Sequence, residues 1–162
     1  MICCKQSLYR SEGGVSGTGG AVGFDVIDIS GDVGIRAFGG TFEEALVSAG
    51  TGFYSLITDA SSVEGRLTRD VEVGAETREE LTVRFLNELV FLFDTYGLIG
   101  RKIDVLRSPG GQGGMSAAFR VSGETFDPVR HERGLLVKAA TYHNLTCEEV
   151  DGTWLLEIMF DI

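Results

Sequence analysis

Oxygen ligands for a hard divalent cation are the clearest chemical signal in this chain. A cation such as calcium needs several carboxylate or carbonyl oxygens that converge from rigid elements. The candidates are four aspartates and one main-chain group: Asp28, Asp32, Asp127, Asp161 and the α-carboxylate of Ile162. Asp161 stands out because it ends an apolar run and is followed at once by the terminal carboxylate, which places two anionic groups within one residue. Either solvent or a bound cation can neutralise such a concentration of charge, and charge alone leaves both possibilities open.

Lys138 is the second candidate for chemistry, because it lies within the apolar segment L-L-V-K-A-A-T-Y-H. The lysine is either partly buried beside a carboxylate or faces outward from a strand. His131 and His143 are twelve residues apart, which is not the spacing of a zinc-binding helix. The sequence contains no nucleophile elbow, Walker A motif, H-E-x-x-H motif or EF-hand loop. No local motif marks a catalytic residue, but a cysteine or serine triad stays open, because its members need not be close in sequence.

The segments that carry Asp32 and Asp161 are predicted to be strands. Residues 24–38 alternate apolar and polar side chains on both sides of a Ser-Gly-Asp sequence, which is typical of two half-buried strands joined by a tight turn. Near the end of the chain, Asp-Gly at 151–152 separates two runs rich in apolar, β-branched and aromatic residues, and it favours the backbone of a two-residue hairpin turn. Asp32 therefore lies at a strand boundary, and the chain ends in a strand of a sheet.

Two helices are predicted from capping signals and apolar periodicity. Thr41 and Thr77 each precede a glutamate by three residues, so that hydroxyl and carboxylate can satisfy free backbone amides at a helix start. The first helix is expected over residues 41–58. The second begins at Thr77, presents a broad apolar face and ends at Gly97 as a C-cap. The polar residues of its opposite face are expected to point to water: Arg84, Asn87 and Glu88.

The remaining strands are predicted over residues 67–73, 102–107, 115–121, 135–149 and 153–160. Two helices separated by runs of strands, without a regular alternation of strand and helix, favour an α+β fold. We expect a two-layer sandwich with a mixed, mostly antiparallel sheet and two helices packed on one face. The domain is expected to span residues 24–162, after a flexible glycine-rich N-terminal tail at residues 1–23.

Charge and composition exclude several classes of protein. The 162 residues carry a net charge of −10, whereas proteins that bind nucleic acids directly present basic surfaces. No segment approaches the ~18 consecutive apolar residues of a membrane-spanning helix, and the N-terminus lacks the pattern of a secretory signal. Cys3, Cys4 and Cys147 do not suggest a disulfide framework. We therefore expect a cytoplasmic protein that binds neither nucleic acid directly nor a membrane.

Four colinear segments carry a resemblance to a known family. They read D-I-S-G-D-V-G-I-R-A-F-G-G-T-F-E-E-A at residues 28–45, L-N-E-L-V-F-L-F-D-T-Y-G-L at 86–98, F-D-P-V-R-H-E-R-G-L-L-V-K-A-A-T-Y-H-N-L at 126–145 and D-G-T-W-L-L-E-I-M-F-D-I at 151–162. The combination of V-K-A-x-T-Y-H with a chain that ends in F-D-I is more specific than any single segment. In these segments the chain resembles the archeases, small accessory proteins of the RtcB-type RNA ligase that works in tRNA splicing.

The resemblance implies a mixed sheet backed by two helices, in agreement with the predicted elements. It also implies a metal-binding, non-catalytic protein that activates an RtcB-type RNA ligase by promoting its guanylylation and multiple turnover in tRNA splicing or RNA repair. Carried over position by position, the metal ligands are Asp32, Asp161 and Ile162, and Lys138 is a further functional residue. Oxygen ligands suit calcium, magnesium or manganese, of which calcium is expected in a structure. GTP is expected to bind only through the ligase.

The chain departs from the family pattern close to the predicted site. The family's D-H-T-A-D reads D-I-S-G-D here, with Ile29 in place of the histidine, and a family Thr-Glu is replaced by Leu135 and Leu136. These replacements leave fewer polar neighbours around the predicted ligands and Lys138. Two other functions remain open, namely a metal-dependent phosphohydrolase that uses the same carboxylates and a protein-interaction module without a metal ion.

Overall fold

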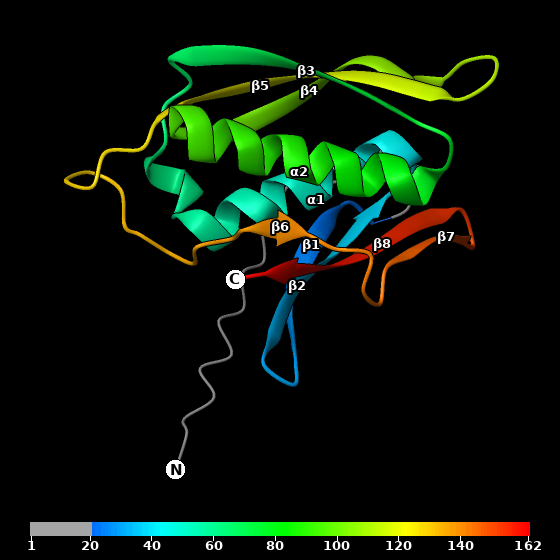
Figure 1. Ribbon diagram of the computed structural model, residues 1–162, viewed down its shortest axis with the longest axis horizontal. Helices are drawn as coiled ribbons and strands as arrows, with labels where there is room; N and C mark the ends of the chain where they lie inside the picture. Colours follow the sequence, from blue (N-terminus) through cyan, green and yellow to red (C-terminus); the bar gives the residue numbers. More distant parts are fainter. Residues whose placement is uncertain (1–20) are drawn as a thin grey trace.

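The computed structural model describes residues 21–162, which form an α+β sandwich of two antiparallel sheets with two helices between them (Figure 1). Every strand pairing among the described residues is antiparallel, and both helices pack against strands of both sheets. The predicted α+β class is confirmed. The division of the strands into a sheet on either side of the helices is not indicated by the sequence pattern. Most of the predicted tail, with Cys3 and Cys4, lies outside the described residues.

The first sheet has five strands and contains both segments of the predicted metal site. Its strands are β1 (Gly23–Ile29), β2 (Asp32–Gly39), β6 (Ala139–Ala140), β7 (Thr146–Val150) and β8 (Thr153–Asp161). Their order is β1-β2-β8-β6, and β7 also pairs with β8. Both predicted hairpin turns are present, and their residues have the positive φ values that two-residue turns require: Ser30, Gly31, Asp151 and Gly152.

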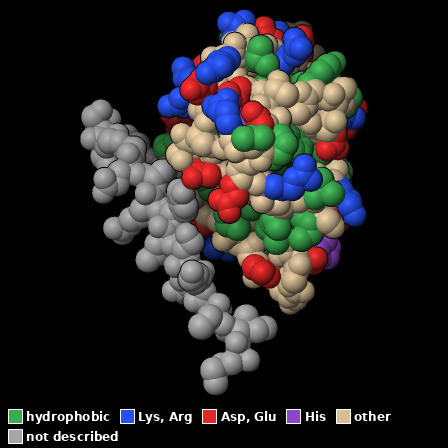
Figure 2. Space-filling view, turned by 90° about the vertical axis from the view of Figure 1, so that its left-hand side faces the viewer, with side chains coloured by type: hydrophobic (Ala, Val, Ile, Leu, Met, Phe, Trp, Pro, Cys, Tyr) green, Lys and Arg blue, Asp and Glu red, His purple; other side chains and the backbone are tan. Residues whose placement is uncertain are grey.

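The second sheet has three strands in the order β3-β5-β4. They are β3 (Leu67–Ala75), β4 (Leu98–Gly110) and β5 (Met115–Thr125). Exposed ion pairs cross this sheet: Arg120 donates two bonds of 2.7 and 3.0 Å to Asp70, and Arg107 donates one of 2.7 Å to Glu72. Basic side chains also lie among acidic ones on the face drawn in Figure 2.

The helices are α1 (Phe42–Ile57) and α2 (Arg78–Tyr96), followed after α1 by a short 3-10 helix, η1 (Ala60–Ser62). Both predicted N-caps are confirmed, because Thr41 Oγ1 accepts the N–H of Glu44 at 3.2 Å and Thr77 Oγ1 accepts the N–H of Glu80 at 3.1 Å. Gly97 ends α2 with a φ of 65°, as a left-handed C-cap. No helix of the described residues is long and apolar enough to cross a membrane.

The hydrophobic core fills the space between the helices and the two sheets. Phe85 of α2 and Phe119 of β5 are both fully buried, with ring centroids 4.4 Å apart. Phe53 of α1 packs against Phe160 of β8 at 5.9 Å. Aromatic pairs of this kind contribute both buried area and specific geometry. The core therefore fixes the last strand against α1.

The predicted strand over residues 135–149 is wrong at residues 135–138 and 141–145, which are not in a strand. Only two residues of this segment form β6, and strand structure resumes at β7. Residues 132–138 instead follow the C-terminal end of α1 (Figure 1).

Hydrogen bonds to α1 explain this course. Gly134 N–H donates to Ile57 O, and Leu135 N–H donates to Leu56 O, both at 2.7 Å. Carbonyls in the last turn of a helix lack partners inside the helix, so they bind any backbone that approaches. A side chain at position 134 would place its Cβ 2.2 Å from Leu56 O, so the approach requires glycine. The segment before Lys138 is thus held by α1.

Candidate metal-binding edge

The beginning of β2 and the end of β8 meet at one end of the first sheet. Asp32 is the first residue of β2, and Asp161 is the last residue of β8. The last register pair of the two strands is Val33 with Phe160, so the next position places Asp32 opposite Asp161. Directly opposed residues of an antiparallel pair project from the same face. The structure therefore brings the two predicted aspartates together.

Both aspartates project away from the core. Phe160 is only 3% exposed and packs on Phe53, so the Phe160 and Val33 positions belong to the face that covers α1. Side chains alternate between faces along a strand, which sends Asp161 and Asp32 to the outer face. Both are exposed there.

The β1–β2 turn does not add Asp28 to this pair. Asp28 Oδ1 accepts the N–H of Gly31 at 3.3 Å and stabilises the turn. Its register partner is Val33, so Asp28 lies on the other face. Ile29, the partner of Asp32, occupies the shared outer face instead, with 43% of its surface exposed.

Lys138 lies beside Asp161. Its N–H donates to Asp161 O at 2.8 Å, and the next residue, Ala139, is the register partner of Asp161. The lysine is exposed, and none of the ion pairs of the described residues includes it. Lys138 faces outward, as one of the two predicted environments has it, but it precedes β6 and is not itself in a strand.

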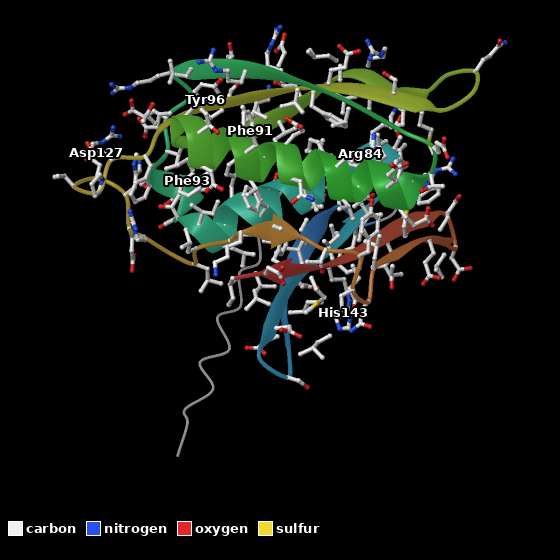
Figure 3. All side chains as sticks on the ribbon, in the orientation of Figure 1. Arg84, Phe91, Phe93, Tyr96, Asp127 and His143 are labelled. Carbon is white, nitrogen blue, oxygen red and sulfur yellow. The ribbon has the colours of Figure 1, made fainter. Side chains whose placement is uncertain are left out.

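Asp127 belongs to a different part of the fold. It lies in the loop after β5, well away from the C-terminus (Figures 1 and 3). Its Oδ1 accepts the N–H of Val129 at 2.9 Å, which is a local turn contact. Asp127 is therefore not available to the edge formed by Asp32 and Asp161.

The donor set at this edge fits a hard divalent cation. Asp32 and Asp161 present carboxylate oxygens from two neighbouring strands, and Ile162 follows Asp161 directly. Within residues 21–162, no group of three His, Cys, Asp or Glu side chains could hold a metal. The described edge therefore offers two side-chain carboxylates, and the other coordination positions of a cation would need main-chain oxygens, water or oxygens from a partner.

The remaining candidate groups have structural environments. His143 is exposed, and its ring nitrogen lies 3.2 Å from the Asn144 amide (Figure 3). Burial raises the pKa of the Cys147 thiol to about 11. Such a thiol stays protonated at neutral pH and is a poor nucleophile and metal ligand.

A buried polar cluster at the end of β5 is missed by the sequence prediction. Glu124 is 5% exposed and accepts bonds from Glu64 N–H at 3.0 Å, from two Arg130 nitrogens at 3.1 Å each and from His131 Nε2 at 2.8 Å. Hydrogen bonds to the carboxylate lower the pKa of Glu124 to about 2. The Glu64 N–H has the largest effect, and the Arg130 guanidinium has the next largest. His131 Nδ1 accepts the N–H of Asp127 at 2.8 Å, so Nε2 carries the proton that is donated to Glu124. The cluster fixes the loop that leads to Lys138.

The fold is expected to lose stability in acid through Glu124. Because the pKa of Glu124 is lower in the folded chain than in the unfolded chain, its charge stabilises the fold above about pH 4.5, and this stabilisation is lost as pH falls toward about 2. Glu124→Gln should lower the urea midpoint at pH 7 and flatten the decline in acid. Urea unfolding across pH measures both effects. The exposed control Glu88→Gln should retain the wild-type profile, and a wild-type profile in Glu124→Gln would refute the assignment.

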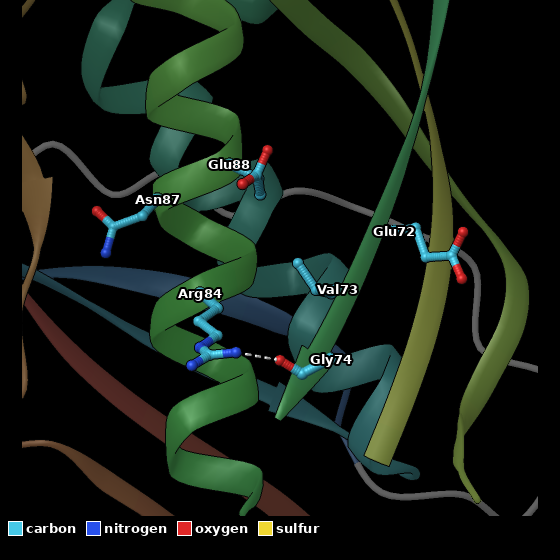
Figure 4. A pocket seen from close by; sticks show the side chains of 6 residues that line it. All are labelled: Glu72, Val73, Gly74, Arg84, Asn87 and Glu88. Atoms are coloured by element: carbon cyan, nitrogen blue, oxygen red, sulfur yellow. Dashed lines mark hydrogen bonds between the residues drawn. The ribbon is translucent and has the colours of Figure 1, made fainter. Parts of the chain in front are cut away.

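A shallow cleft between β3 and α2 shows how α2 is tied to its neighbours (Figure 4). Arg84 Nη1 donates to Gly74 O of β3 at 2.7 Å. Asn87, one turn further along the helix, points away from β3, and its amide is bonded to the backbone of Ala140. The expectation that Asn87 points to water is therefore wrong.

Comparison with known proteins places this small α+β protein in a family. A model of the archease protein family (MTH1598/TM1083) matches residues 24–162. The archease of Pyrococcus abyssi is 35% identical over 132 residues, which are 81% of this chain and 92% of that protein. The archease of Sulfolobus acidocaldarius is 32% identical over 139 residues, which are 86% of this chain and 98% of that protein. This chain belongs to the archease family.

Solved structures agree with this assignment. The solution structure of Methanobacterium thermoautotrophicum protein 1598 matches with a TM-score of 0.76 and 31% identity, over 86% of this chain and 99% of that chain. The crystal structure of a Thermotoga maritima archease, described as a possible chaperone, matches with a TM-score of 0.57 and 18% identity, over 84% of this chain and 94% of that chain. The second likeness concerns the fold alone.

Proposed function

We propose that this protein is a non-catalytic accessory protein that activates an RtcB-type RNA ligase in tRNA splicing or RNA repair. Membership of the archease family is the observation that carries the proposal. The protein promotes guanylylation of the ligase and so allows multiple turnover. The ligase retains the covalent chemistry, and GTP binds only through the ligase.

Asp32, Asp161 and the carboxylate of Ile162 are the proposed ligands of calcium, magnesium or manganese. Their placement on adjacent strands, on the outer face of the sheet, supports this assignment. A bound divalent ion supplies positive charge that stabilises phosphate oxygens. The strands hold the carboxylates at the end of the sheet, where a partner protein can reach them.

Lys138 is the proposed second component of this edge. Its backbone bond to Asp161 fixes the distance between the two residues along the sheet, while its side chain is exposed. An ammonium group held in this way can donate to a phosphate oxygen of GTP in the ligase site. The net charge of −10 supports contact with the ligase, and not with RNA, as the mode of action.

Lys138→Gln is expected to reduce the rate of ligase guanylylation roughly tenfold to a hundredfold at saturating accessory protein. The substitution removes a positioned charge but leaves the fold intact. The measurement is the rate at which the ligase incorporates labelled GTP. Lys102→Gln is the matched control, since Lys102 lies on the second sheet and pairs with Asp104 at 2.9 Å. Equal rates for the two variants would remove Lys138 from the proposal.

Two outcomes would favour the other functions. Hydrolysis of phosphoesters or nucleotides by the isolated protein, dependent on a divalent ion, would indicate a phosphohydrolase. Stimulation of the ligase without binding of calcium, magnesium or manganese in calorimetry would indicate an interaction module without a metal ion.

A further inference from the structure

The strand next to Lys138 is short and needs support beyond its own sheet. β6 has two residues and lies at the end of the strand order β1-β2-β8-β6. Thr141, just after β6, donates its N–H to Met159 O of β8 at 3.0 Å. Backbone groups alternate in direction along an antiparallel strand, so the N–H and C=O of Ala140 point away from β8. They need partners on the other side, because Ala140 is buried.

Asn87 of α2 supplies both partners. Its Oδ1 accepts the N–H of Ala140 at 2.9 Å, and its Nδ2 donates to the C=O of Ala140 at 3.2 Å. One side chain therefore replaces the hydrogen bonds that a further strand would make. Figure 4 shows Asn87 on the side of α2 that faces away from β3, whereas Arg84 reaches Gly74 of β3. Polar side chains thus tie α2 to both sheets.

The contact requires an amide at position 87. A carboxamide carries a donor and an acceptor side by side, which matches the N–H and C=O of one residue. Aspartate has the same shape but only acceptors, so it would place a negative charge against the Ala140 carbonyl. Asn87→Asp therefore removes the hydrogen bond to the Ala140 C=O and leaves the volume of the side chain almost unchanged.

The segment that carries Lys138 is held at both ends. Before it, Gly134 and Leu135 are bonded to the last turn of α1. After it, Ala140 is bonded to Asn87. We propose that Asn87 is a positioning residue, which holds β6 so that Lys138 stays beside Asp161. The effect of Asn87 on ligase activation rests on the role proposed above for Lys138.

Amide hydrogen exchange, followed by NMR, tests the structural part of the proposal. Asn87→Asp keeps an acceptor for the Ala140 N–H but sets a carboxylate against the Ala140 C=O. The repulsion should displace β6 and accelerate amide exchange at Ala140 and Lys138 by roughly tenfold. Amides in the middle of α1 should exchange at the wild-type rate. The exposed neighbour Glu88 gives the control Glu88→Gln, which should leave all of these rates unchanged. Wild-type exchange at Lys138 in Asn87→Asp would overturn the proposal.

Ligase stimulation tests the functional part. Asn87→Asp should lower the maximal stimulation and leave the concentration for half-maximal stimulation unchanged, because Lys138 is misplaced while docking is retained. A variant that was merely less folded would need a higher concentration and reach the same maximum, and this result would overturn the proposal. If the wild-type protein does not stimulate the ligase, the proposed function fails, and exchange at Ala140 and Lys138 alone decides whether Asn87 positions β6.

Discussion

Asp161→Asn is expected to weaken binding of calcium, magnesium and manganese by about a hundredfold or more and to remove most stimulation of the ligase. The amide keeps the shape of the side chain and removes the charge of one of the proposed ligands at the edge of the first sheet. Hard cations depend on the number of charged oxygens for affinity. Asp32→Asn should have the same effect, because Asp32 lies opposite Asp161 in the register. Isothermal calorimetry and ligation assays measure the two consequences.

Asp25→Asn is the matched control for both variants. Asp25 is an exposed aspartate of β1 in the same sheet, and its side chain has no hydrogen bond or ion pair with a described residue. The Asp25→Asn variant should bind metal and stimulate the ligase like the wild type. Full metal affinity in Asp161→Asn would show that the ion, if any, binds elsewhere. Full stimulation without metal affinity would separate the accessory role from the metal.

Phe160→Ala is expected to lower the free energy of unfolding by about 3 to 5 kcal/mol, the usual cost of removing a buried phenylalanine. Phe160 is 3% exposed, packs on Phe53 and precedes Asp161 directly. It also pairs with Val33 and Ala140 in the register. This decrease would be a large part of the total free energy of unfolding of a domain of this size. Urea unfolding measures it.

Phe91→Ala is the control for this loss. Phe91 is 50% exposed on α2 and contacts Tyr96 edge-on at 6.1 Å. Its replacement should cost about 1 kcal/mol or less, because little buried surface is removed. Similar losses in the two variants would mean that Phe160 does not anchor β8 to the core as the structure indicates.

Local signals in the sequence predict much of the first sheet and both helices. The caps at Thr41 and Thr77 depend on a hydroxyl and a carboxylate a few residues apart, and both are found. The two hairpins depend on adjacent turn residues, which have the expected positive φ values. Asp32 and Asp161 could be assigned to strand ends for the same reason. Their pairing, however, is implied by the family resemblance and not by any local pattern.

Contacts between distant residues could not be predicted. The segment before Lys138 is apolar, which favours a strand, but the free carbonyls at the end of α1 bind it instead. The helical pattern places Asn87 on the solvent-facing side of α2, and its partner, Ala140, lies 53 residues away, beyond the reach of any local pattern. Glu124 and its donor Glu64 are 60 residues apart, and nothing local identifies the pair.

The departures from the family pattern leave apolar residues near the proposed site. Ile29 is 43% exposed on the face of Asp32, and Leu136 is 61% exposed two residues before Lys138. Neither can contribute a ligand to a cation. Within this chain, the proposed ligands of the ion are therefore Asp32, Asp161 and Ile162 alone.

The most direct test of the proposed function is a ligation assay with the cognate RtcB-type ligase, GTP, a divalent ion and RNA ends in large excess over the ligase. We expect the ligase alone to stop near one turnover per molecule, and addition of this protein in substoichiometric amounts to carry the reaction through many turnovers. The same number of turnovers with and without the protein would contradict the proposed function.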